Sequence, residues 1–330
     1  MNRRKFIGLI SGATAAWPLA PRAQQPERTK RIAVLMAYAE SDPAAQFEVA
    51  AFREALAKLG WTEGSNLRIE LRWSAGDADR VRTFAKELVD LRPDVILSQT
   101  TIVTGLLARE TRTIPIVFVN VADPITSGLT ASLTHPGGNV TGFALFEPGI
   151  GGKWVELLKE IAPRTVSVAL LSNPATGAPV QFLMPYIQAA ASSLAVQVNA
   201  APFHAKDEIE GIIAKQARNP GGGLIVMPAA FSVANRELII GLAARYGVPA
   251  IYFNRFFAES GGLIAYSGDY AEQFRSAATY IDRILKDAKP ADLPVQNPTK
   301  YELLINMKTA RALGLDVPLH LQQIADEVIE

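Results

Sequence analysis

The residues best placed for chemistry in this chain are polar and aromatic side chains that follow its predicted β-strands. Ligands of parallel α/β sheets bind beyond the carboxyl ends of the strands, so residues just after each strand are the natural candidates. These candidates are Tyr38, Thr100, Thr101, Asp123, Asn173, Phe231, Asn254, Arg255, Tyr266 and Asp269. Most are uncharged, with two acids and one arginine, which suits a small molecule.

The polar members of this set predict a site for a carboxylate-bearing molecule. A helix that opens at Thr100 and Thr101 would bind a carboxylate through the unpaired N–H groups of its first turn. Asp123 or Asp269 would bind an ammonium group, and Arg255 offers a second carboxylate site. A small zwitterion, an amino acid first, is therefore the expected ligand.

The remaining candidates indicate an apolar ligand body. Tyr38, Phe231 and Tyr266 offer flat apolar surface. A sugar site would need more acids and amides facing aromatic platforms than Asn173 and Asn254 supply. The expected cleft is therefore largely apolar, with few polar anchors.

Each candidate also has a structural role open to it. The two threonines can simply cap their helix, and Asp123 stands before a proline, as in an ordinary turn or helix start. Arg255 can pair with Glu259 on the surface, and Asp269 can cap a helix that begins at the next residue. The shared position at strand ends, rather than any single residue, carries the prediction.

The composition excludes several other kinds of chemistry. The chain has no cysteine, which rules out thiolate nucleophiles, zinc–thiolate sites and disulfides, and no phosphate-binding or nucleophile-elbow glycine motif. Its three histidines, His135, His204 and His320, lack partners at metal-ligand spacing, so we expect no metal and no cofactor. With 33 basic and 32 acidic residues and a net charge of +1, nothing indicates a nucleic-acid partner.

Short apolar runs alternate with helical patterns along the chain, and this alternation predicts an α/β protein with parallel sheets. Ten strands fall into two sets of five, so we expect two doubly wound lobes. The run over residues 67–73 alternates apolar and polar residues, which predicts a sheet-edge strand. Helices are predicted at 44–59, 79–91, 153–161, 207–217, 232–246 and 270–287.

The lobes should be joined by a hinge of several crossovers. Glycine and proline are frequent over residues 146–152, which predicts one crossover there. Further crossovers are expected near residues 267–269 and 294–298. The predicted N-terminal lobe comprises residues 28–146 plus 268–297, and the C-terminal lobe comprises 147–267 plus 298–330.

The first 23 residues have the pattern of a signal peptide. Arg3, Arg4 and Lys5 precede an uncharged, mostly apolar stretch, and small residues lead to Ala23. The paired arginines are similar to those of the twin-arginine route. The pattern predicts export to the periplasm, cleavage near Ala23 and a mature chain that does not span the membrane.

The sequence resembles the ABC transporter substrate-binding family whose better-known members bind tryptophan, tyrosine or phenylalanine and have the type I periplasmic binding protein fold. The resemblance covers nearly the whole chain, and its most specific stretches are residues 128–142, 261–263, 280–286, 298–306, 312–315 and 325–330. It implies a non-enzymatic role: ligand capture between two hinged lobes. It also implies permease and ATPase subunits as partners.

Two other functions remain open at this level. A sensor-type binding protein of the same fold would pass its ligand to no permease. A periplasmic hydrolase or isomerase would use Asp123 and Asp269 as paired carboxylates. The first reading, a monomeric binding protein for a small molecule, is the one we expect.

Overall fold

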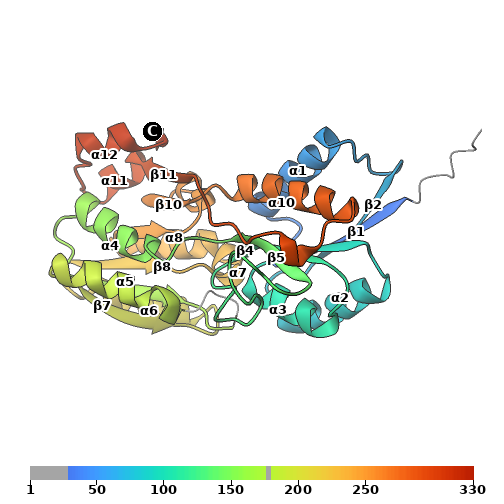
Figure 1. Ribbon diagram of the computed structural model, residues 1–330. Coiled ribbons are helices and arrows are strands. Elements are labelled where there is room, and N and C mark those ends of the chain that lie inside the picture. Colours follow the sequence, from blue (N-terminus) through green and yellow to red (C-terminus); the bar gives the residue numbers. More distant parts are fainter. Residues whose placement is uncertain (1–28, 176–179) are drawn as a thin grey trace, which may run out of the picture.

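The computed structural model describes residues 29–175 and 180–330, which form two α/β lobes lying side by side (Figure 1). The predicted fold class, two lobes built on largely parallel sheets, is confirmed. The predicted signal peptide lies outside the described residues.

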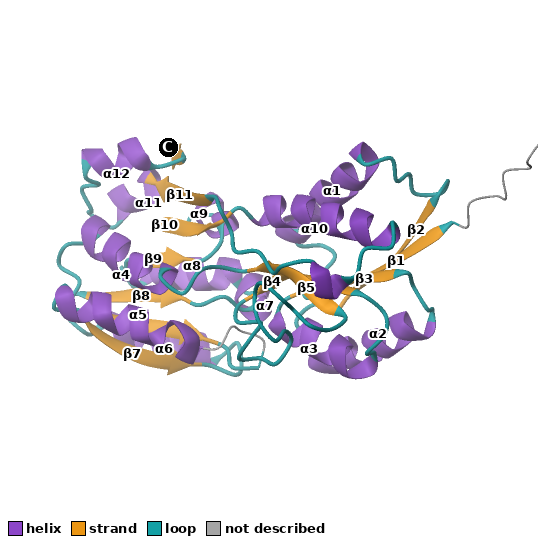
Figure 2. Ribbon diagram, in the orientation of Figure 1, coloured by secondary structure: helices purple, strands orange, loops and turns teal. Residues whose placement is uncertain are grey.

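The N-terminal lobe is built on a five-stranded parallel sheet. In spatial order its strands are β2 (Leu67–Trp73), β1 (Lys30–Met36), β3 (Val95–Gln99), β4 (Ile116–Val121) and β5 (Val140–Ala144). The alternating strand β2 lies at the edge, as predicted. Helices α1 (Pro43–Lys58) and α10 (Tyr270–Leu285) pack against each other on one face, and α2 (Ala78–Asp90) and α3 (Thr101–Glu110) pack on the other (Figure 2).

The C-terminal lobe has a seven-stranded sheet. Its order is β12 (Glu327–Ile329), β11 (Tyr301–Asn306), β10 (Ile264–Gly268), β9 (Ala250–Tyr252), β8 (Gly222–Val226), β6 (Ser167–Ser172) and β7 (Gln197–Pro202). Only the β10–β11 pair is antiparallel among the described pairs. Its helices are α4 (Ile150–Ile161), α5 (Val180–Ser193), α6 (Glu208–Ala217), α7 (Ala230–Ala234), α8 (Arg236–Arg245), α9 (Arg255–Glu259), α11 (Met307–Ala312) and α12 (Leu319–Ile324).

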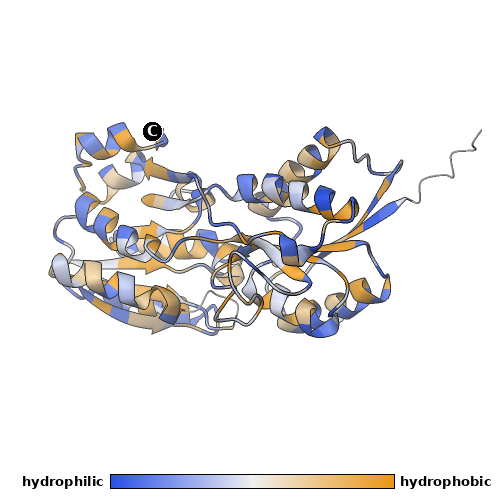
Figure 3. Cartoon of the chain, in the orientation of Figure 1, coloured by the Kyte–Doolittle hydropathy of each residue, from blue (hydrophilic) through white to orange (hydrophobic). Residues whose placement is uncertain are grey.

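The central strands are buried because helices cover both of their faces. Strands β3, β4 and β5 are buried along their whole length, as continuous apolar runs require. Figure 3 shows hydrophobic colour along such strands, whereas the helices carry both colours. Gly142 in β5 has a φ of +152°, and a Cβ there would lie 2.1 Å from the carbonyl oxygen of Phe118, so only glycine fits.

Three connections join the lobes. The first follows β5, the second leads from β10 into α10, and the third runs from Gln296 to β11. Gln296 accepts a hydrogen bond from the backbone of Ala144 at 2.8 Å, which ties the third connection to the N-terminal sheet. Across the hinge, the Tyr301 hydroxyl accepts a hydrogen bond from the Glu147 amide at 3.1 Å.

Candidate ligand-binding site

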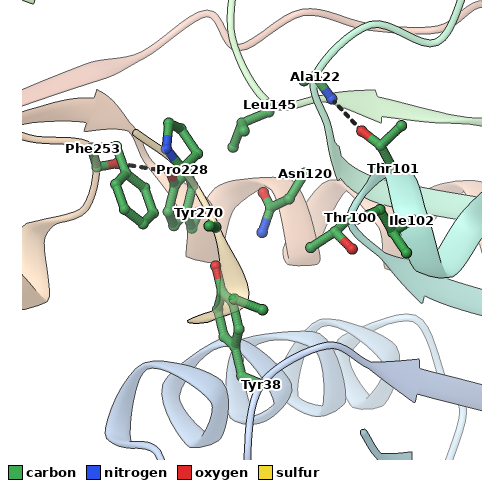
Figure 4. Close-up of a pocket in the computed structure, with 12 residues that line it drawn as sticks. Tyr38, Thr100, Thr101, Ile102, Asn120, Ala122, Leu145, Pro228, Phe253 and Tyr270 are labelled. Atoms are coloured by element: carbon green, nitrogen blue, oxygen red, sulfur yellow. Dashed lines mark hydrogen bonds between the residues drawn. The ribbon is translucent and has the colours of Figure 1, made fainter. Parts of the chain in front are cut away.

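A pocket lies where the strand ends of the two lobes face each other (Figure 4), with about 380 Å³ of empty space that includes part of its opening to solvent. Its lining residues are Tyr38, Thr100, Thr101, Ile102, Asn120, Ala122, Leu145, Pro228, Ala229, Ala230, Phe253 and Tyr270. Those up to Leu145 follow or end strands of the N-terminal sheet, and the next four follow β8 and β9. The cavity therefore occupies the ligand position expected for doubly wound sheets.

Thr100 holds an unusual backbone conformation at the edge of this cavity. Its φ of 76° and ψ of 158° fall in a region that is almost restricted to glycine. Its side chain makes no capping hydrogen bond to α3, so the alternative of a simple helix cap is not observed for Thr100. The Thr101 hydroxyl instead accepts a hydrogen bond from the Ala122 amide at 3.1 Å, which ties the helix start to the end of β4.

Asn120 is a polar residue inside a strand that is buried along its whole length. It lies in β4 with a φ of 58°, and only 4% of it is exposed. Neither its Oδ1 nor its Nδ2 has a hydrogen-bond partner among the described residues, although its backbone amide donates to Gln273 Oε1 at 3.2 Å. Figure 4 shows its amide in the middle of the cavity, between Tyr270 and Thr100.

An unpaired amide of this kind has a real energetic cost. A buried polar group without a partner costs about 1–3 kcal/mol, and strained non-glycine backbone costs about as much again. Asn120 and Thr100 carry both kinds of cost at one cavity. Such features persist at functional sites, where a ligand supplies the missing hydrogen bonds.

Buried polar residues form part of the cavity wall and extend behind it. The Tyr270 hydroxyl donates to the carbonyl of Phe253 at 2.7 Å. Gln99 Nε2 donates to Glu48 Oε2 at 2.7 Å, and burial raises the pKa of the Glu48 carboxyl well above its ordinary value. Burial likewise raises the pKa of the Tyr38 hydroxyl. Burial thus favours the neutral form of both groups.

The structure brings three of the ten predicted residues, Tyr38, Thr100 and Thr101, into the cavity lining. Phe231 and Asn254 are next in sequence to lining residues. Phe231 packs on Phe203 with ring centroids 5.6 Å apart, and Asn254 caps α9 by accepting from the Phe256 amide at 2.9 Å.

The other five predicted residues make structural contacts outside the lining. Asp123 accepts from the Thr126 amide at 3.0 Å, as a turn residue does, and Asn173 donates to the Phe203 carbonyl at 3.1 Å. Asp269 accepts from the Glu272 amide at 2.9 Å and thereby caps α10, the structural role that the sequence left open for it.

Arg255 and Tyr266 are also engaged within the protein. Arg255 forms ion pairs with Glu259, Glu302 and Glu327 at 2.7–2.9 Å, so the surface pairing with Glu259 that the sequence left open is observed. Tyr266 stacks on Tyr301 in the hinge, with centroids 5.5 Å apart.

The two lobes touch each other beside the cavity. Arg236 of α8 and Asp42, which caps α1, form an ion pair with an Nη1–Oδ2 distance of 3.4 Å. Their side chains are only 10% and 9% exposed. Phe47 of α1 meets Phe256 of α9 edge-to-face, with centroids 5.9 Å apart. These contacts join α1 of the N-terminal lobe to α8 and α9 of the C-terminal lobe.

Comparison with known proteins shows which family has this architecture. A sequence model of the family described as ABC transporter substrate binding protein matches residues 31–329, almost all of the described chain. The chain belongs to this substrate-binding protein family. The resemblance drawn from the sequence, including the type I periplasmic binding protein fold, is thereby confirmed.

Relatives of this substrate-binding protein include a tyrosine-binding protein of Clostridioides difficile. The two are 26% identical over 271 residues, which span 80% of this chain and 75% of the relative. Two solved structures share its fold with a TM-score of 0.84, and each matches 91% of this chain and all of its own. One is an ABC domain from Streptococcus pneumoniae in complex with L-Trp, 24% identical, and the other is a Vibrio cholerae conserved domain protein, 26% identical.

The described residues of this substrate-binding protein contain no helix long and apolar enough to cross a membrane. Within the same residues, no cluster of three or more histidines or carboxylates could hold a metal ion.

Proposed function

We propose that this protein is the extracytoplasmic binding component of an ABC transporter. It captures a small carboxylate-bearing molecule with an apolar body between its lobes and delivers it to a permease driven by an ATPase. The observation that carries the proposal is the cavity at the strand ends of both lobes, where Asn120 lacks partners and Thr100 is strained.

The ligand class is supported by the lining. The N-terminus of α3 offers first-turn N–H groups to an anion, and Leu145, Pro228, Ala230 and Phe253 offer apolar surface. Tyrosine and L-Trp, which appear in the names of similar proteins, are both carboxylates with an aromatic body.

Capture would work by lobe closure. A ligand in the cavity contacts both lobes, so its affinity for the closed form exceeds that for the open form and shifts the population. The proposed route to the periplasm is export through the N-terminal segment, with cleavage near Ala23. Sequencing of the mature N-terminus in periplasmic material would check this step.

The proposal is tested by a thermal-shift screen of aromatic and aliphatic carboxylates, sugars and oligopeptides, followed by solution X-ray scattering. We expect a carboxylate to raise Tm, since a ligand at 100 times its Kd stabilises by about 2.7 kcal/mol, and to lower the radius of gyration. Stabilisation by sugars or oligopeptides alone would contradict the ligand class. An unchanged radius at saturation would contradict capture by closure.

A further inference from the structure

The cavity lining has a property that the sequence did not predict: none of the lining residues carries a charge. The acids expected to bind an ammonium group, Asp123 and Asp269, accept hydrogen bonds from backbone amides outside the lining. The carboxyl of Glu48 is fully buried and lies outside the lining; its Oε2 accepts from Gln99 Nε2, and its Oε1 has no partner among the described residues. An ammonium group that entered the cavity would therefore lose its hydration without gaining an anionic partner.

Unlike an ammonium group, the carboxylate of a ligand would find hydrogen-bond donors in the cavity. Helix α3 spans ten residues, has no acidic residue in its first turn and has no side-chain cap. Its first N–H groups are thus open to an anion. A second, independent feature points to the same place: Asn120, 96% buried, directs an amide with two unpartnered ends into the cavity beside Thr100 (Figure 4).

The amide of Asn120 is both a donor and an acceptor, and this determines which ligand groups it can bind. Its Nδ2 can donate to a carboxylate oxygen, but its Oδ1 then needs a donor from the ligand. A hydroxyl group on the carbon next to the carboxylate supplies a neutral donor at the right chemical position. An ammonium group would also donate, but its charge would remain uncompensated in this lining.

We infer that the ligand is a 2-hydroxy carboxylate with an aromatic or branched apolar body. Asn120 hydrogen-bonds its carboxylate through Nδ2 and its hydroxyl through Oδ1. This inference rests on the proposed function, because it refines the carboxylate class named there. It makes Asn120 the specificity-determining residue of the cavity.

The test compares matched ligands that differ at one atom. The probes are 3-phenyllactate, phenylalanine and 3-phenylpropanoate, with leucine and its 2-hydroxy analogue as an aliphatic pair, each titrated calorimetrically into the full mature chain. We expect the hydroxy acid to bind about tenfold or more tightly than the amino acid, because of the uncompensated charge. We also expect it to bind more tightly than the des-hydroxy acid, which leaves Asn120 Oδ1 unpaired.

The Asn120→Asp variant adds a negative charge and removes the Nδ2 donor at nearly constant shape. The variant should bind the hydroxy acid at least tenfold more weakly than the wild-type protein does, and its preference should shift toward the amino acid. Asn66→Asp is the matched control, because Asn66 is only partly buried, lies outside the cavity lining and caps a turn through Thr62 and Gly60; it should change neither affinity. Asn120→Ala should abolish the advantage of phenyllactate over phenylpropanoate.

The outcomes separate the inference from the proposed function. An amino acid that binds the wild-type protein as tightly as its hydroxy analogue overturns the inference and leaves the carboxylate proposal standing. An unchanged preference in a folded Asn120→Asp variant also overturns it. If no carboxylate binds, both the inference and the proposed ligand class fail.

Discussion

The ion pair between Asp42 and Arg236 links the two lobes, and Asp42→Asn tests what it contributes to closure. Asp42 Oδ1 also accepts from the Ala44 amide at 2.8 Å, a helix-capping bond that asparagine can keep. The substitution therefore removes the charge and preserves the cap. In the open protein both groups would be solvated, so the effect should fall on closure rather than on folding.

The size of the effect follows from the geometry. At 3.4 Å and an effective dielectric constant of about 20, the Coulomb attraction is about 5 kcal/mol, and desolvation of two nearly buried groups offsets much of it. Removal of Asp42 leaves Arg236 buried without its counter-ion in the closed form. We expect closure to become less favourable by about 2 kcal/mol, which weakens ligand binding roughly thirtyfold.

Isothermal titration calorimetry measures the change in Kd, and solution scattering of the ligand-free protein measures its mean compactness. Asp77→Asn is the matched control, because Asp77 caps α2 in the same way at 2.8 Å from the Asp79 amide and forms no ion pair with the other lobe among the described residues. If Asp42→Asn and Asp77→Asn have equal affinities, the ion pair does not contribute to closure.

Two further predictions concern stability. Gly142→Ala should lower the free energy of unfolding by about 3 kcal/mol or more, because its Cβ would overlap the backbone of Phe118; Gly138→Ala, with nothing within 4 Å of its Cβ, should change little in the same urea titration. Burial raises the pKa of Glu48 above its ordinary 4.5, so the folded state keeps a proton that the unfolded chain loses, and stability should fall as pH rises above about 4.5. Glu48→Gln should flatten this fall in unfolding curves recorded from pH 4.5 upward, and an identical slope in both proteins would show that Glu48 does not cause it.

Much of the fold was predictable from the sequence because the buried strands are continuous apolar runs. The expected helix at 232–246 is instead two helices, α7 and α8, which meet at Asn235, whose side chain bonds back to the Phe231 carbonyl. Helix α5 escaped prediction because its sequence is apolar without a clear face and contains Pro185. Strand β11 pairs antiparallel with β10, a long-range pairing that no local pattern shows.

The candidate pocket lies at the strand ends that the sequence indicated, but its lining contains only three of the ten predicted residues. Strand-end reasoning found Tyr38, Thr100 and Thr101, yet it favoured acids, and acids at these positions also suit helix caps, as Asp269 shows. Asn120 lies within β4 rather than after it, so a search after strand ends passed over it. The available signal was an amide inside an otherwise apolar buried strand, where polar residues are rare.

The structure separates the tendency to close from the choice of ligand. Asp42 and Arg236 meet outside the cavity lining, so their ion pair favours closure equally for every ligand. Asn120 lies in the lining, so it changes the relative affinities of ligands without touching the inter-lobe pair. Asp42→Asn should therefore lower the affinities for the hydroxy acid and the amino acid by the same factor, whereas Asn120→Asp should change the ratio of the two affinities. Because Asn120 does not contact the ion pair, the double variant should show the sum of the two free-energy changes within about 0.5 kcal/mol. A larger departure would mean that the cavity and the ion pair are coupled.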